Sequence, residues 1–132
     1  MTFYERFLND INMLHRRYPY FEMIDVDEAI LKQTECLQVD DQTKCAILAI
    51  DTSMRMQDLV NDINKDRYVL STDLLSALFY RYLATPFSQK HYQLLTACVA
   101  EQNELKQVYA DTKDEQLLDK INNIFVAPFK GK

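Results

Sequence analysis

The chain has very little of the residues that build tight turns. Among its 132 residues there is one glycine, at position 131, and there are three prolines, at positions 19, 86 and 128. Sandwiches and barrels of short strands need a turn signal roughly every ten residues. This shortage excludes such folds and predicts an all-α protein.

Long apolar runs and a basic surface are also missing. No run approaches the ~20 apolar residues of a membrane-spanning helix, and residues 1–6 lack the pattern of a secretion signal. The chain has 15 basic and 20 acidic residues, a net charge of −5, and no basic stripe. We therefore expect a cytoplasmic protein with no membrane span and no nucleic-acid partner.

Cysteine is scarce, and the three that are present form no ligand motif. Cys36, Cys45 and Cys98 include no CxxC pair and no Cys/His pair, so no zinc site is predicted. Cys45 and Cys98 lie in apolar surroundings. We expect them to be small core residues in a reducing compartment.

Apolar periodicity predicts six helices in one domain, residues 1–132. Thr2 with Glu5 forms a capping box, and apolar residues then recur every three or four positions until Pro19. Asp25 with Glu28 predicts a second helix, and Thr112 with Glu115 predicts the last one. The helices are expected at about 2–18, 25–37, 43–63, 67–84, 88–110 and from 112 onward, with Pro86 ending the fourth. Helices of this number and length favour a bundle of mostly antiparallel neighbours.

The most informative acids are Asp58 and Asp62, four residues apart in the predicted third helix. This spacing places both carboxylates on one helix face, as in divalent-metal diphosphate sites, and Asp51 lies one heptad earlier. Leu59 stands where an adjacent second carboxylate would be. Such a row faces either solvent or a cavity, and Asp73 in the fourth helix is likewise either exposed or turned toward the third helix.

Two segments resemble one family. Residues 49–62 are similar to the first aspartate-rich helix of trans-prenyl diphosphate synthases, whose pattern ends in Asp-Asp-x-x-Asp, and residues 69–75 resemble the helix that follows there. In that comparison Asp58 and Asp62 match the outer acids, Leu59 replaces the middle one, and Asp73 matches the acid of the next helix. The expected fold is then the N-terminal half of a class I isoprenoid synthase.

The departures from that pattern also carry information. The chain ends before a second aspartate-rich motif, and only Lys65 and Arg67 follow the acids. The resemblance is therefore to the small, non-catalytic subunit of heterodimeric bacterial hexaprenyl or heptaprenyl diphosphate synthases. It implies that this chain is inactive alone and holds no metal or cofactor. It also implies a large subunit that binds Mg²⁺ and condenses isopentenyl units into C30–C35 chains, for quinones such as menaquinone.

The resemblance also implies a partner interface and a role in chain length. The small subunit would contact the large subunit through residues 67–84 and 88–110. Large side chains at that boundary would form a wall that stops the growing prenyl chain. The candidates, for each of which plain core is the alternative interpretation, are Leu74, Leu75, Leu78, Phe79 and Tyr82.

Two other interpretations remain open at this point. One is a free-standing helical interaction module unrelated to isoprenoids, with Asp58 and Asp62 on a solvated face. The other is a small enzyme that completes its site by homodimerisation, against which the missing acid at Leu59 argues. Mg²⁺-dependent turnover by the purified chain would distinguish the second from the rest.

Overall fold

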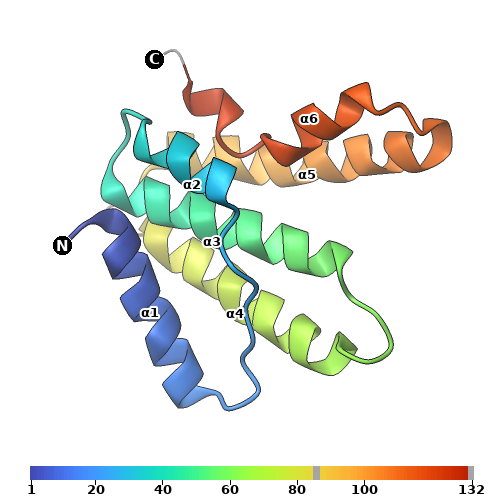
Figure 1. Cartoon of the computed structure of the whole chain (residues 1–132). Coiled ribbons are helices and arrows are strands. Elements are labelled where there is room, and N and C mark those ends of the chain that lie inside the picture. Colours follow the sequence, from blue (N-terminus) through green and yellow to red (C-terminus); the bar gives the residue numbers. More distant parts are fainter. Residues whose placement is uncertain (85–86, 131–132) are drawn as a thin grey trace.

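A long central helix, α3 (Asp41–Asp58), organises the fold, and the other helices pack around it (Figure 1). The computed structural model describes residues 1–84 and 87–130. Within these residues the chain forms six α-helices, the 3-10 helix η1 (Ala127–Phe129) and no β-strand, which confirms the all-α prediction. The other helices are α1 (Phe3–Arg17), α2 (Glu28–Glu35), α4 (Lys65–Ala84), α5 (Gln89–Thr112) and α6 (Gln116–Asn122).

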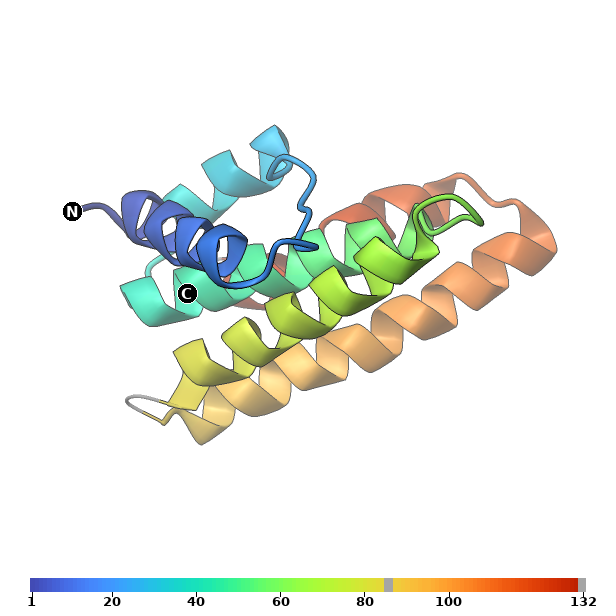
Figure 2. The same cartoon turned by 90° about the horizontal axis from the view of Figure 1, so that it is seen from below.

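The core lies along α3. Every residue from 45 to 54 is buried, because α3 is covered on several sides by its neighbours. Helix α4 returns antiparallel along α3, and the Ser53 hydroxyl donates a hydrogen bond to the Thr72 carbonyl at 3.3 Å. Helix α5 then runs beside α4 (Figure 2), where the ring centroids of Tyr80 and Tyr92 are 6.1 Å apart.

Helix α1 begins as the sequence predicts. The Glu5 amide donates to the Thr2 hydroxyl at 3.1 Å, and the Thr2 amide donates to the Glu5 carboxylate at 3.2 Å. Phe3, Phe7 and Ile11 are buried on its inner face. Local capping and apolar spacing therefore determine this element.

The start of α2 differs from the prediction. Its N-cap is Asp27, whose carboxylate accepts the Ile30 amide at 3.0 Å, so the predicted cap at Asp25 is wrong. Both aspartates are acceptable caps by residue type. Asp27 is selected because its carboxylate also lies 3.6 Å from Arg55 of α3, a contact that no local pattern encodes.

The junction of α5 and α6 also differs. Helix α5 continues through Thr112 and ends at Lys113, which has a left-handed backbone (φ 58°). Thr112 is thus the end of one helix and cannot cap the next, so the predicted Thr112–Glu115 capping box is wrong. Ser88 caps α5 as predicted, accepting the His91 amide at 3.3 Å. The prediction at Pro86 lies outside the described residues.

The segment after α6 closes the core above α3 and α5. Cys98 donates to the Ile124 carbonyl at 3.4 Å, and Ile124, Phe125 and Phe129 are buried. Cys45 and Cys98 are both core residues, as expected, whereas Cys36 is exposed. No helix in the described part of the chain combines the length and apolarity needed to cross a membrane, and a cytoplasmic location stays a prediction.

Candidate functional site

The aspartate motif lies at the end of α3 and in the loop that follows. Asp58 is the last residue of α3, Leu59 is its C-cap, and Asp62 is in the α3–α4 loop. The expectation that Asp58 and Asp62 share a helix face is therefore wrong. Because the helix ends at Asp58, the Asp62 carboxylate does not lie one helical turn away on the same face.

Two asparagines end α3 early. The Asn64 side-chain amide donates to the Leu59 carbonyl at 3.1 Å, and the Asn61 side-chain oxygen accepts the amides of Ile63 and Asn64 at 2.8 and 3.0 Å. Short polar side chains that bond to nearby backbone compete with helical hydrogen bonds. The α3–α4 loop is therefore an ordered turn held by its own side chains.

Asp58 is neutralised within the chain. The Lys106 ammonium of α5 lies 3.0 Å from Oδ1 and 2.9 Å from Oδ2 of Asp58, so both carboxylate oxygens are engaged. Lys106 is 48 positions away in sequence, and no local pattern indicated it. The Lys106 ammonium thus contacts the two oxygens that a metal-binding carboxylate would offer to a divalent ion.

Asp51 is neutralised in the same way, but inside the protein. It is 2 % exposed, and its Oδ2 accepts a hydrogen bond from Arg55 Nε at 2.8 Å. Burial raises the pKa of Asp51 to about 6, against the lowering effect of the Arg55 hydrogen bond and charge. Arg55 also donates to the Asn122 carbonyl at 2.8 Å and pairs with Asp27, so it connects α3 to α6 and to the start of α2.

The predicted acidic row is thus divided among different environments. Asp51 is buried against Arg55, Asp58 is bound to Lys106, and Asp62 and Asp73 are exposed. Mg²⁺ requires several free oxygen ligands in near-octahedral geometry. Among the described residues, no three His, Cys, Asp or Glu side chains gather in a way that could hold a metal ion.

A pocket of about 320 Å³ opens beside Asp58. Gln102, 5 % exposed, lies in its wall and donates to the Ile121 carbonyl at 3.0 Å. Its Oε1 has no hydrogen-bond partner among the described residues. The lining residues are Ile24, Arg55, Asp58, Leu59, Gln102, Ile121 and Asn122.

Four of the five wall candidates lie in the core of this chain. Leu75, Leu78, Phe79 and Tyr82 are at most 4 % exposed, and Leu74 is half-buried. The Tyr82 hydroxyl donates a 2.5 Å hydrogen bond to Asp10 of α1, so its polar end is also used internally. Whether any of them limits a prenyl chain stays a prediction.

The outward face of α4 carries a different set of side chains. Val69, Leu70 and Tyr80 are 50, 44 and 52 % exposed. Tyr80 belongs to a row of aromatic rings from α4, α5 and the residue Phe87 that precedes α5, in which neighbouring centroids are 5.1 to 6.1 Å apart. The row comprises Phe79, Tyr80, Tyr92 and Phe87. A pocket of about 260 Å³ between α3, α4 and α5 lies against Phe79 and Tyr80.

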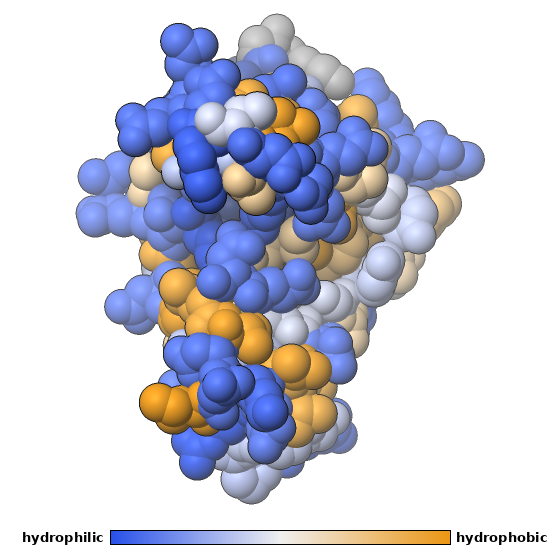
Figure 3. All heavy atoms as spheres, turned by 90° about the vertical axis from the view of Figure 1, so that its right-hand side faces the viewer, coloured by the Kyte–Doolittle hydropathy of each residue, from blue (hydrophilic) through white to orange (hydrophobic). Residues whose placement is uncertain are grey.

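A second exposed apolar group lies at the α3–α4 loop. Leu59, Val60 and Ile63 are 51, 38 and 97 % exposed. Figure 3 faces this end of the molecule, and apolar atoms gather in its lower half, whereas the upper half is mostly polar. Sequence reasoning missed this group because it assigned the three residues to a longer α3.

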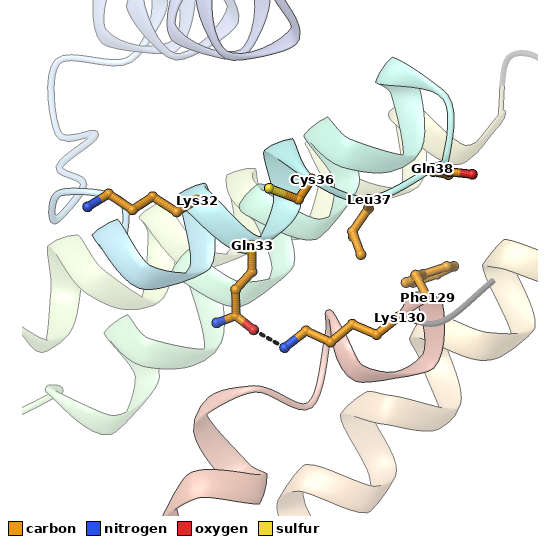
Figure 4. A pocket seen from close by; sticks show the side chains of 7 residues that line it. All are labelled: Lys32, Gln33, Cys36, Leu37, Gln38, Phe129 and Lys130. Carbon is orange, nitrogen blue, oxygen red and sulfur yellow. Dashed lines mark hydrogen bonds between the residues drawn. The ribbon is translucent and has the colours of Figure 1, made fainter.

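Another pocket lies away from the aspartate motif. It measures about 500 Å³ and lies between the end of α2 and η1 (Figure 4). Leu37 and Phe129 form its apolar part, and Gln33 accepts a hydrogen bond from Lys130 at its edge. None of the predicted site residues lines it.

The described residues thus form an all-helical protein in which Asp58 and Asp51 are paired with Lys106 and Arg55, and Leu59 stands between Asp58 and Asp62. Among the described residues, the class of protein is an all-helical bundle with no assembled metal site. Residues 1–130 match the model of the family described as hexaprenyl diphosphate synthase, small subunit, and the chain belongs to this family. A small-subunit family implies a large partner subunit, and an unrelated interaction module is not supported.

Proposed function

We propose that this chain binds a catalytic large subunit and forms with it a C30–C35 all-trans polyprenyl diphosphate synthase. The observation that carries this proposal is the family match over residues 1–130. The internal pairing of Asp58 with Lys106 and of Asp51 with Arg55 supports a non-catalytic role. In this proposal Mg²⁺ and the condensation step belong to the large subunit.

The outward faces of α4 and α5 are the proposed interface. The outward face of α4 exposes Val69, Leu70 and Tyr80, Phe87 is exposed just before α5, and the aromatic row adds large rigid side chains. Buried aromatic residues contribute most of the binding energy in many interfaces. Small residues such as Ala77 and Ala97 lie exposed on the same two helices and allow close approach.

Chain-length control is proposed for the outward residues of α4. A side chain that limits a tunnel in the partner must project from this subunit, which Leu75, Leu78 and Tyr82 do not. Tyr80 is half exposed and packs on Phe79, with ring centroids 5.1 Å apart. We therefore place the wall at Tyr80, with the buried Phe79 holding its ring in position.

Reconstitution tests the proposal. Incorporation of isopentenyl diphosphate into polyprenyl products is measured with this chain alone, the large subunit alone and the two mixed. We expect activity in the mixture only. Mg²⁺-dependent turnover by this chain alone, or no effect of this chain on the large subunit, would contradict it.

A further inference from the structure

We propose that the α3–α4 loop is a preformed apolar contact that binds a pocket on the large subunit. The proposal concerns a tip patch, defined as Leu59, Val60, Ile63, Val69 and Leu70. It rests on the proposed function, because it assigns a further contact to the same partner. Figure 3 shows the apolar atoms of this end of the molecule among polar neighbours.

The loop presents its apolar side chains in a fixed arrangement. Besides the Asn61 and Asn64 contacts described above, the Asn61 amide donates to Asn64 Oδ1 at 2.9 Å and the Lys65 amide donates to the Asn61 carbonyl at 3.0 Å. These bonds fix the backbone around Ile63, whose apolar side chain is 97 % exposed. A loop that is already ordered loses little conformational entropy when it binds.

The tip patch shares two residues with the proposed interface. Val69 and Leu70 belong both to the patch and to the outward face of α4. A partner that covers α4 would therefore extend onto Ile63 without a second, separate contact. Ordinary monomeric surfaces rarely gather large apolar residues into one contiguous patch, which is typical of interaction sites.

Charge selects the kind of partner. Three acidic residues flank the patch in sequence and form no ion pair within the described residues: Asp62, Asp66 and Asp73. Lys65, which lies between them in sequence, also forms no ion pair within the described residues. This rim has an excess of negative charge. A second copy of the chain would bring like charges together, whereas an apolar pocket bordered by Lys or Arg would complement the rim. We therefore assign the patch to the large subunit.

The test compares two exposed apolar residues. Ile63→Ser removes the most exposed member of the patch without adding charge, and Met13→Ser removes a residue that is 63 % exposed on α1, on the other side of the bundle (Figure 1). Calorimetric titration with the large subunit should give a Kd at least about 10-fold weaker for Ile63→Ser. Met13→Ser should bind like the wild type, and both should keep the wild-type Tm.

A second variant tests the rim. The double substitution Asp62→Lys with Asp66→Lys should slow association with the large subunit, and added salt should reduce the difference from the wild type. Rapid-mixing fluorescence measures this rate. An association rate equal to that of the wild type at low salt would overturn the charge argument.

The outcomes separate the two proposals. If the wild type binds the large subunit and Ile63→Ser binds equally well, the tip patch is not a contact and the proposed function stands. If the wild type does not bind at all, both proposals fail. If instead the chain self-associates and Ile63→Ser makes it monomeric, the patch is a homodimer surface and its assignment to the large subunit is overturned.

Discussion

At the residue scale, one arginine links three parts of the chain. Arg55 binds the buried Asp51, the Asn122 carbonyl at the end of α6, and Asp27 at the start of α2. A buried carboxylate without a partner would be costly, so Arg55 and Asp51 depend on each other. The same arginine thereby fixes where α2 begins and where α6 lies against α3.

Asp51 should make stability depend on pH. Burial raises its pKa to about 6 from an ordinary value of 3.8, so the folded state binds the proton more tightly than the unfolded state. Protonation therefore stabilises the fold, and this contribution is lost as pH rises through about 6. When the pH is lowered from ~7.5 to ~4.5, we expect the free energy of unfolding of the wild type to increase by about 2 kcal/mol relative to that of Asp51→Asn.

Chemical denaturation of both proteins at each pH measures this difference. Subtracting the Asp51→Asn values removes the contributions of the other carboxylates, which are common to the two chains. A difference in unfolding free energy that is constant with pH would show that Asp51 keeps the same pKa when folded and unfolded.

At the element scale, α4 has two faces with different roles. Its inner face contributes Leu75 and Leu78 to the core, and its outer face exposes Val69, Leu70 and Tyr80. The sequence shows more large apolar residues than one face needs but not which of them point outward. Which residues of α4 are buried depends on where α3 and α5 pack against it.

The two faces predict different outcomes for truncation. Tyr80→Ala should leave the fold intact and lengthen the polyprenyl product of the reconstituted complex, because it removes the proposed wall. Leu78→Ala, its buried control, should lower the free energy of unfolding by about 2–5 kcal/mol through cavity formation. Product analysis by chromatography and denaturant unfolding measure the two effects. A product of unchanged length from Tyr80→Ala would place the wall in the large subunit.

At the scale of the whole molecule, the aspartate motif has become part of the structure. Asp58 connects α3 to α5 through Lys106, and Asp62 is a surface residue of an ordered loop. Exposed ion pairs contribute at most about 1 kcal/mol. Replacing Asp58 and Asp62 should therefore disturb neither the folding of this chain nor the reaction at the partner subunit.

Replacing Asp58 and Asp62 together by Ala should leave the activity of the mixed complex within about threefold of the wild type. Isopentenyl incorporation at saturating concentrations of this chain is the measurement, with complex assembly followed by gel filtration. A loss of turnover beyond ~100-fold with normal assembly would show that these carboxylates act in the reaction.

Local patterns predicted the parts of this protein that depend on neighbours in sequence. The Thr2–Glu5 capping box, the buried stripe of α1 and the Ser88 cap of α5 follow from residue type and helical spacing. The family resemblance also came from short runs, and the match over residues 1–130 confirms it. These features need no knowledge of which helices touch.

The tertiary structure decided the features that depend on distant residues. Asp27 caps α2 beside Arg55, Lys106 pairs with Asp58 across 48 positions, and α4 turns Leu78 inward and Tyr80 outward. A helical period identifies an apolar side chain but not the element that covers it, because burial is a property of the assembled helices. For the same reason the neutralised acids and the exposed Ile63 became visible only in the folded chain.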